Sequence, residues 1–258
     1  MRDVALHTEM SREASDAAAS QTVPDSRALT TSDLSLTIDQ KPLIRDVTLS
    51  LSPDGITMVM GPNGAGKSLL LRLIHGLIPP SSGRVHWGGR TLSDDLRRDQ
   101  SMVFQKPVVL RRSVAANVDF ALKARGVRDP ARRDALLEHV GLLDHARQPA
   151  RLLSGGEQQR LALARALATE PKVMLMDEPT ASLDPASVLK IEQIVQEARA
   201  KGTKIIFVTH DLGQAGRLAD DVIFMNRGRL HEYGPADLFL SRPVTQEARD
   251  FLQGRIVV

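Results

Sequence analysis

One eight-residue segment constrains the fold more than any other part of the chain. It fits the pattern G-x-x-x-x-G-K-[ST] at every fixed position and consists of Gly61, Pro62, Asn63, Gly64, Ala65, Gly66, Lys67 and Ser68. A continuous apolar run (55–60) precedes it, and residues 68–74 have the pattern of a buried helix. A strand, a glycine loop and a helix in this order surround phosphate with backbone N–H groups. The segment therefore predicts a nucleotide site, in which Lys67 neutralises phosphate oxygens and Ser68 binds Mg²⁺.

Two adjacent carboxylates follow a second apolar run, at 173–176. Strands of open α/β sheets present their ligand-binding groups at their C-terminal ends. Asp177 is therefore predicted to hold Mg²⁺, and Glu178 to polarise the water that attacks the γ-phosphate. His210 follows a third run (205–209) and is expected at the same edge, whereas the other histidines are interpreted as surface or core residues.

The remaining pattern predicts an α/β fold. Alternating apolar residues at 28–51 indicate an antiparallel hairpin, and the apolar spacing between 108 and 165 indicates a helical insert. Two short β runs, 172–176 and 204–208, are separated by a helical stretch at 186–200, which is a βαβ unit and predicts a parallel sheet.

Composition excludes some alternatives. The 34 Lys and Arg residues exceed the 31 Asp and Glu residues by only three and are scattered, which does not favour nucleic acid as a partner. The chain has no cysteine, so it has no disulfide and no thiolate site. The apolar runs are much shorter than the roughly 20 residues that span a bilayer. Residues 1–27 have the composition of a disordered tail and no signal-peptide pattern.

A further motif, Leu153-Ser154-Gly155-Gly156-Glu157-Gln158-Gln159-Arg160, resembles the signature of ABC ATPases. It lies between the phosphate loop and the carboxylate pair, and the resemblance extends from about residue 28 to 234. Gln105 matches the Q-loop of this family, Asp184 its D-loop and His210 its switch histidine. The resemblance implies a P-loop NTPase of the ABC ATPase fold, with a parallel core sheet, an N-terminal antiparallel β subdomain and a helical signature subdomain (about 108–165). The ATPase domain is expected over 28–240 and a C-terminal helical extension over 241–258.

The same resemblance implies a head-to-tail homodimer with ATP and Mg²⁺ bound between the copies. The phosphate loop of one copy and Ser154, Gly155 and Gly156 of the other then close around each ATP, and Asp184 of the D-loop is expected among the nucleotide-binding residues. A helix beginning near Glu157 gives the signature segment an anion-binding end with nothing to bind in its own chain. Glu178, Gln105 and His210 are expected to sense the γ-phosphate, and Gln105 also to bind the metal.

One position departs from the family pattern. ABC ATPases usually stack adenine on an aromatic residue in the early β region, but no aromatic residue precedes Trp87, and Ile38 holds the expected position. The extra energy of an aromatic contact, about 0.5–1.5 kcal/mol, is then lost, which predicts weak discrimination between ATP and GTP.

The transport role is expected from resemblance alone. Residues 102–113 resemble the Q-loop region of bacterial oxyanion importers, closest to those for tungstate and next to those for molybdate and phosphate. This implies transmembrane permease subunits, an extracytoplasmic substrate-binding protein, and a peripheral position on the cytoplasmic face of the inner membrane. The alternatives are an exporter subunit for lipoproteins or peptides, or an ABC ATPase without a permease. The short stretch after Gly234, with a helical pattern at 244–252, argues against a regulatory C-terminal domain.

Overall fold

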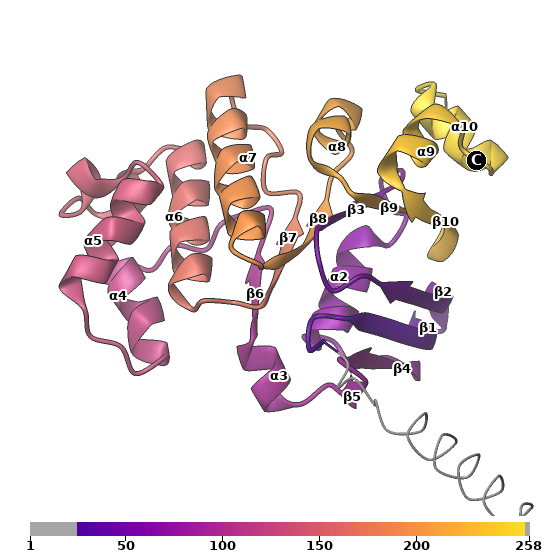
Figure 1. The fold of residues 1–258 in the computed structure, drawn as a ribbon, viewed down its shortest axis with the longest axis horizontal. Helices are drawn as coiled ribbons and strands as arrows, with labels where there is room; N and C mark the ends of the chain where they lie inside the picture. Colours follow the sequence, from indigo (N-terminus) through magenta and orange to yellow (C-terminus); the bar gives the residue numbers. More distant parts are fainter. Residues whose placement is uncertain (1–24, 256–258) are drawn as a thin grey trace, which may run out of the picture.

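The computed structural model describes residues 25–255 of the chain, so residues 1–24 of the predicted tail lie outside the described residues. It contains two sheets and a set of helices, arranged as in Figure 1. None of its described helices is long and apolar enough to cross a membrane.

The smaller sheet is antiparallel, in the order β2-β1-β4-β5. Its strands are β1 (Leu29–Ile38), β2 (Lys41–Leu51), β4 (Ser82–Trp87) and β5 (Arg90–Thr91). Most apolar side chains of β1 and β2 face inward and are buried, because successive side chains of a strand point to opposite faces. The predicted hairpin is confirmed, whereas the sequence reasoning did not identify β4 and β5.

The larger sheet supports the site and has the order β10-β9-β3-β8-β7-β6. Its strands are β3 (Ile56–Met60), β6 (Gln100–Val103), β7 (Val173–Asp177), β8 (Lys204–Val208), β9 (Asp221–Asn226) and β10 (Arg229–Pro235). The neighbours from β6 to β9 pair in parallel, and β10 pairs antiparallel with β9. The predicted parallel core is confirmed, and β3, β7 and β8 bring their C-terminal ends to one edge.

Helices cover this sheet and extend from it. They are α2 (Lys67–His75), α3 (Asp94–Arg98), α4 (Val114–Ala124), α5 (Pro130–His139), α6 (Gly155–Ala168), α7 (Pro185–Ala200), α8 (Leu212–Leu218), α9 (Ala236–Ser241) and α10 (Gln246–Leu252). Two 3-10 turns, Leu143–His145 and Ala150–Leu152, lead into α6. In Figure 1, α4, α5 and α6 form the end of the molecule away from the antiparallel sheet. The signature helix begins at Gly155 rather than near Glu157, because Ser154 is its N-cap.

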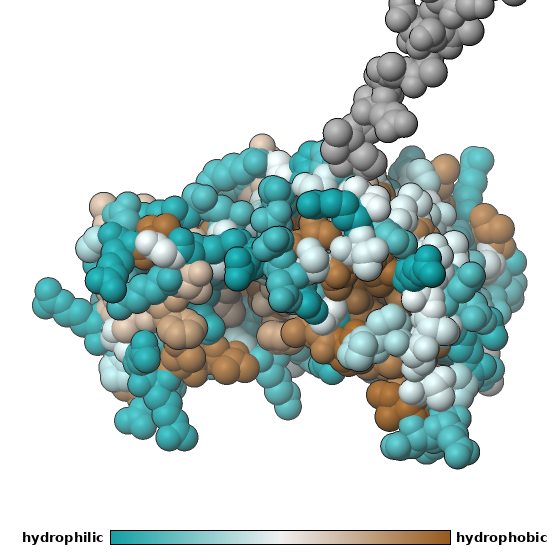
Figure 2. Space-filling model, turned by 90° about the horizontal axis from the view of Figure 1, so that it is seen from below, coloured by the Kyte–Doolittle hydropathy of each residue, from teal (hydrophilic) through white to brown (hydrophobic). Residues whose placement is uncertain are grey.

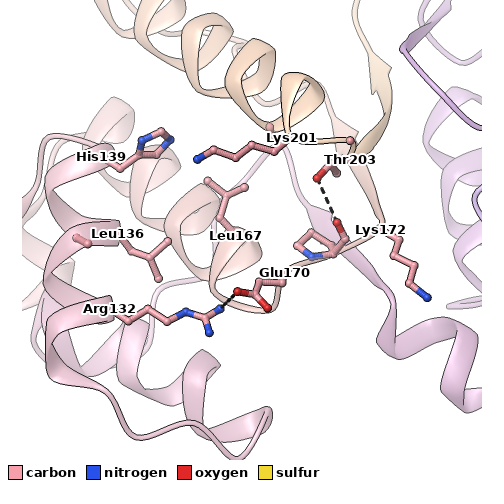
Figure 3. A pocket seen from close by; sticks show the side chains of 12 residues that line it. Arg132, Leu136, His139, Leu167, Glu170, Lys172, Lys201 and Thr203 are labelled. Atoms are coloured by element: carbon pink, nitrogen blue, oxygen red, sulfur yellow. Dashed lines mark hydrogen bonds and ion pairs between the residues drawn. The ribbon is translucent and has the colours of Figure 1, made fainter.

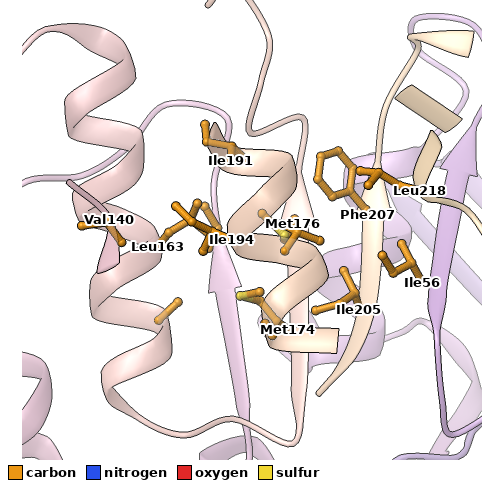
Figure 4. Close-up of a cluster of buried hydrophobic side chains, with 14 of the residues drawn as sticks. Ile56, Val140, Leu163, Met174, Met176, Ile191, Ile194, Ile205, Phe207 and Leu218 are labelled. Atoms are coloured by element: carbon orange, nitrogen blue, oxygen red, sulfur yellow. The ribbon is translucent and has the colours of Figure 1, made fainter. Parts of the chain in front are cut away.

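The parallel sheet carries a buried layer on each face. Ile56, Met174 and Ile205 belong to the cluster that includes α6 and α7, which Figure 4 shows. Their sequence neighbours Leu175 and Ile206 belong to the cluster on the other face, with α2 and the antiparallel sheet. Strands buried on both faces read as continuous apolar runs, which is why the sequence predicts them well.

Candidate active site

The phosphate loop is shaped by glycines that a side chain could not replace. Gly66 has φ +98°, and a Cβ there would lie 2.7 Å from Ile44 Cδ1. A Cβ at Gly61 would lie 2.0 Å from the Met225 carbonyl oxygen of the neighbouring strand. The loop ends at the N-terminus of α2, which carries a partial positive charge. These positions need glycine both for conformation and for the close approach of backbone to backbone.

Lys67 is the cation of this loop. Its side chain is buried, and Nζ donates to the Gly61 carbonyl at 2.8 Å and the Pro62 carbonyl at 3.1 Å. Burial lowers the pKa of Lys67, and the carboxylates of Glu178 and Asp177 oppose this shift. The ammonium is therefore fixed among oxygen atoms at the mouth of the loop, as contact with phosphate requires.

Ser68 and Asp177 lie in direct contact. Ser68 Oγ donates to Asp177 Oδ1 at 2.6 Å, and burial raises the pKa of Asp177 above its usual value. A hydroxyl and a carboxylate are the hard oxygen ligands that Mg²⁺ prefers. The two side chains thus fit the metal role predicted for them, and a bound cation would relieve the desolvation of the carboxylate.

The predicted catalytic side chains lie around the carboxylate of Glu178. Its carboxylate lies 3.9 Å from Lys67 Nζ and 3.6 Å from His210 Nδ1, and Gln105 Nε2 donates to it at 3.3 Å. Glu178 follows β7, and the other three side chains come after β3, β8 and β6. The C-terminal ends of these strands lie at one edge because the strands are parallel. The Glu178 backbone has φ +44°, a left-handed conformation that is unfavourable for a non-glycine residue.

The hollow at the phosphate loop is small. It has a volume of about 230 Å³ and is lined by residues 63–69 and Glu178. None of Ser154, Gly155 and Gly156 lines it. The described chain thus contributes the phosphate loop and the carboxylate to this hollow, and the predicted signature residues lie elsewhere.

The signature residues form a well-capped helix end. Ser154 Oγ accepts from the Glu157 backbone N–H, and the Glu157 side chain accepts from the Ser154 backbone N–H at 2.7 Å, which is a capping box. Gly155 is exposed, whereas Gly156 is buried against Ser187 at the start of α7. One N–H of this helix end is satisfied by Ser154, and the helix end as a whole remains favourable for an anion.

Two further predicted residues lie outside this cluster. Asp184 is the N-cap of α7 and accepts from Ser187 Oγ at 2.6 Å and from the Ser187 backbone N–H at 3.0 Å. Ile38 ends β1 at the hairpin turn, and 44% of its surface is exposed. An exposed aliphatic side chain at this position is available to cover a base.

Sequence reasoning missed one residue that supports the loop. Gly228, in the turn between β9 and β10, donates from its N–H to the Ala65 carbonyl at 2.9 Å and accepts from the Arg45 N–H at 2.8 Å. A Cβ there would lie 2.3 Å from the Leu43 carbonyl oxygen. This glycine joins the phosphate loop to the antiparallel sheet, and its signal in the sequence is an Asn-Arg-Gly turn after an apolar strand.

A second hollow lies away from this edge, where β7 and β8 begin. It has a volume of about 560 Å³ between α5, α6 and α7, and Figure 3 shows its lining. Its polar groups are already engaged in part, since Arg132 pairs with Glu170 at 2.7 Å and Thr203 Oγ1 donates to the Pro171 carbonyl at 3.2 Å. This hollow contains none of the predicted nucleotide-binding residues.

ATP-binding proteins of ABC transporters match most of the chain. The family model described as "ABC transporter" matches residues 44–181. The Phosphate import ATP-binding protein PstB of Thermotoga maritima is 37% identical over 84% of this chain and 94% of its own length. The protein of the same name from Mycoplasmoides gallisepticum is 35% identical over 84% of this chain and 72% of its own length.

Solved structures of ABC transporter subunits resemble this chain in fold. The cbiO1 subunit of Clostridium perfringens, part of the ABC transporter complex cbiONQ, is 29% identical with a TM-score of 0.74, over 87% of this chain and 94% of its own. A dimeric ATP-binding cassette in a post-hydrolysis state with ADP and Pi is 28% identical with a TM-score of 0.74, over 81% of this chain and 98% of its own. The chain therefore belongs to the ABC transporter family, as one of its ATP-binding and ATP-hydrolysing subunits.

Proposed function

We propose that two copies of the chain close head to tail around two ATP molecules. The observation that carries this proposal is the separation of two half-sites. The phosphate hollow is lined by residues 63–69 and Glu178, while the capped helix end at Ser154, Gly155 and Gly156 takes no part in it. Two half-sites on one chain are completed when a second copy supplies the other half, in an isologous dimer. The solved relative that is dimeric with ADP and Pi supports this arrangement.

Within each composite site, the roles follow from chemistry. Glu178 accepts a proton from the attacking water, and Lys67 stabilises the charge on the phosphate oxygens. Ser68 and Asp177 would hold Mg²⁺, and the Gln105 amide, whose Nε2 donates to Glu178, would have Oε1 left to bind it. A bound Mg²⁺ would neutralise charge on the phosphate oxygens. His210, 3.6 Å from Glu178, senses the γ-phosphate, and Asp184 contacts the partner copy.

To test these roles, ATP turnover and oligomeric state by size exclusion are measured for the wild-type chain and for Glu178→Gln, each with ATP and Mg²⁺. We expect hydrolysis to fall by about 10²- to 10⁴-fold, because the general base is lost while nucleotide binding remains. The variant should also form an ATP-dependent dimer, because bound ATP persists. Hydrolysis at the wild-type rate would remove Glu178 from this role.

The transported substrate is an inorganic oxyanion that enters the cell, and phosphate is the first candidate. Relatives named for phosphate import, at 34–37% identity, support this substrate. Tungstate is the second candidate, because residues 102–113 resemble the Q-loop region of tungstate importers. On this proposal the chain is peripheral on the cytoplasmic face of the inner membrane, with permease subunits and, indirectly, an extracytoplasmic binding protein.

A surface beside Gln105 is suited to the permease. Exposed Phe104, Val108 and Phe120 line a hollow of about 320 Å³ next to β6. Val114, at the start of α4, is fully buried in the core and takes no part in this surface. On the face seen in Figure 2, hydrophobic side chains gather toward the middle, between hydrophilic ends.

A basic hollow adjoins this apolar surface. Its lining includes Arg111, Arg112, Arg147 and Arg151 and no acidic residue, and Arg112 lies 5.7 Å from the Phe120 ring centroid. Apolar and cationic surfaces in contact fit a permease segment with apolar and acidic side chains. This would make the Q-loop the link between the nucleotide and the permease.

The substrate is tested by deleting the gene in its host and measuring uptake of labelled phosphate and tungstate. Loss of phosphate uptake alone supports the first candidate, and loss of tungstate uptake alone supports the second. Unchanged uptake of both, with a defect in export of lipoproteins or peptides, would favour the exporter alternative. A chain that remains in the soluble fraction and co-purifies with no membrane protein would favour an ATPase without a permease.

A further inference from the structure

A buried glutamine lies directly behind the proposed catalytic residues. Gln214 is in α8, four residues after His210, and its side chain has no exposed surface. Its backbone N–H donates to the N-cap Asp211 at 2.9 Å, which fixes it in the first turn of the helix. A buried amide of this kind is costly unless its donor and acceptor are both satisfied.

Both polar atoms of this amide have partners on other elements. Nε2 donates to Glu192 Oε1 at 3.1 Å, and Oε1 accepts from Thr180 Oγ1 at 3.2 Å. The Glu192 carboxylate has only acceptors when ionised, so it requires the NH₂ side of the amide. The oxygen side must then face Thr180, whose hydroxyl acts as the donor.

Glu192 is a firm anchor for this chain of hydrogen bonds. It lies in α7 with 5% of its surface exposed, and Arg217 donates to both of its oxygens, at 2.9 Å from Nε and 2.6 Å from a terminal nitrogen. A bidentate guanidinium pair fixes both the position and the plane of a carboxylate. Gln214 therefore hydrogen bonds to a group that is itself held in place.

The other end of the chain of hydrogen bonds lies in the loop of the catalytic carboxylate. Thr180 is two residues after Glu178, whose φ of +44° is unfavourable. The Glu178 N–H donates to the Val208 carbonyl at 3.2 Å, and its carbonyl accepts from Ala181 at 3.2 Å. Strained backbone persists only where surrounding contacts hold it, and the Thr180 hydroxyl supplies one such contact.

We infer that Gln214 is a positioning residue, which holds the Glu178 loop and the helix after His210 in one arrangement by bridging Thr180 and Glu192. The inference rests on the roles proposed above for Glu178 and His210. It assigns Gln214 no contact with ATP or water. Its effect is on the relative placement of the carboxylate and the imidazole, which lie 3.6 Å apart.

The main test is Gln214→Met, which keeps a similar volume and removes both hydrogen bonds. We expect kcat for ATP to fall by about 10- to 100-fold, because a small misplacement of catalytic groups costs rates of that order. The KM for ATP should change by less than about twofold, since the phosphate loop is untouched. Thr180→Val, which cuts only the link to the catalytic loop, should lower kcat in the same way, and the double variant should be no worse than the worse single variant.

The matched control is Gln193→Met, the same change at an exposed glutamine of α7. It should leave kcat, KM and the melting temperature unchanged. If Gln214→Met and Thr180→Val both lower the melting temperature and leave kcat within about twofold of wild type, the network is structural only and the inference is wrong. If Glu178→Gln also hydrolyses ATP like wild type, the proposed role of Glu178 fails instead.

A pH profile separates positioning from packing. Gln214→Glu places a second carboxylate against Glu192, with Arg217 as the cation nearest to the pair. Like charges raise the pKa of one member, and its protonated form restores an O–H donor between the two groups. The kcat of this variant, relative to wild type, should therefore rise as pH falls from about 8 to about 6. A ratio that does not vary with pH would contradict the inferred donor role.

Discussion

The two ends of the proposed ATP site differ in how complete they are within one chain. At the phosphate loop, Lys67, Gln105 and His210 all lie within 4 Å of Glu178, and Ser68 is bonded to Asp177. At the signature helix, the first turn is capped by its own residues and lies outside that hollow. The first end contains groups for chemistry, whereas the second offers only a rigid, anion-favouring helix end.

This difference leads us to expect different effects of substitutions at the two ends. Residues at the phosphate loop contact one another, so their geometry can be tested in a single chain. A Cβ on Gly155 would make only an ordinary contact with Leu183, while a Cβ on Gly156 would overlap Ser187 of the same chain. We expect substitutions at Gly155 to act on the dimer and those at Gly156 to act on the folded chain itself.

Among the substitutions that compare these two ends, the largest effect is expected at Gly155. Gly155→Val should fold and bind ATP like wild type, because a Cβ there meets nothing closer than Leu183 Cδ2 at 3.9 Å. Hydrolysis should fall by about 100-fold or more, since the added side chain would block the approach of the partner's ATP to the helix N–H groups. Turnover and thermal melting measure the two effects separately, and wild-type turnover would show that this face is not part of the site.

A smaller effect, on stability, is expected at Gly156. A Cβ there would lie 2.4 Å from Ser187 Oγ and 2.9 Å from its Cβ. Gly156→Ala should therefore destabilise the chain by about 1–3 kcal/mol, as overpacking does. Adding Ser187→Gly should restore part of the loss in denaturant unfolding. No recovery would mean that the cost has another origin.

A substitution at Ile38 should have a smaller effect, on the preference for one base over another. Ile38→Tyr should raise the preference for ATP over GTP by about 0.5–1.5 kcal/mol, the extra energy of an aromatic contact. Measuring KM for ATP and for GTP in the wild-type chain and in Ile38→Tyr gives this change in preference. A strong ATP preference already present in the wild-type chain would show that Ile38 does not account for base selection.

The smallest effect concerns the cap of the signature helix. Hydrogen bonds from Ser154 lower the pKa of Glu157 below its usual value. A carboxylate with a lowered folded-state pKa stabilises the fold above its unfolded pKa, and this contribution is lost as pH falls through the folded pKa. Glu157→Ala should thus lower the free energy of unfolding at neutral pH by no more than about 1 kcal/mol, the usual energy of a helix cap, and lower the melting temperature accordingly. The difference from wild type should shrink below about pH 4, and a constant difference would exclude this linkage.

Much of the fold was predictable because its elements have strong local signals. β3, β7 and β8 are short apolar runs between turn residues, and Gly61 to Ser68 form a motif whose spacing fixes a loop and a helix. Of the side chains that meet at Glu178, His210 was predicted from its place after a strand, Lys67 from the glycine-loop motif and Gln105 from the family resemblance. Strand β4 was missed because its sequence, Ser82–Trp87, mixes polar and apolar residues, with a buried residue only at Val85 and Trp87. Strand β9 has a clear apolar run at 222–225, which the sequence reasoning did not assign.

The supporting residues could not be predicted from local pattern. Gly228 matters because two distant segments approach its backbone, and Gln214 because its amide lies between Thr180 and Glu192. Both effects depend on tertiary contacts between elements far apart in the chain. A glycine in a turn and a glutamine in a helix are otherwise ordinary residues in a sequence.

The central claim is that each ATP is held by two copies of the chain, and mixing two inactive variants tests it most directly. Lys67→Met removes the phosphate-loop cation, and Gly155→Val blocks the signature face. In a mixed dimer, one site receives both defects, whereas the other has an intact loop and an intact signature. The account predicts that each variant alone is inactive and that mixing them restores ATP hydrolysis. A mixture that stays as inactive as the separate variants, although a tag on one variant co-purifies the other and so shows that mixed dimers form, would contradict it.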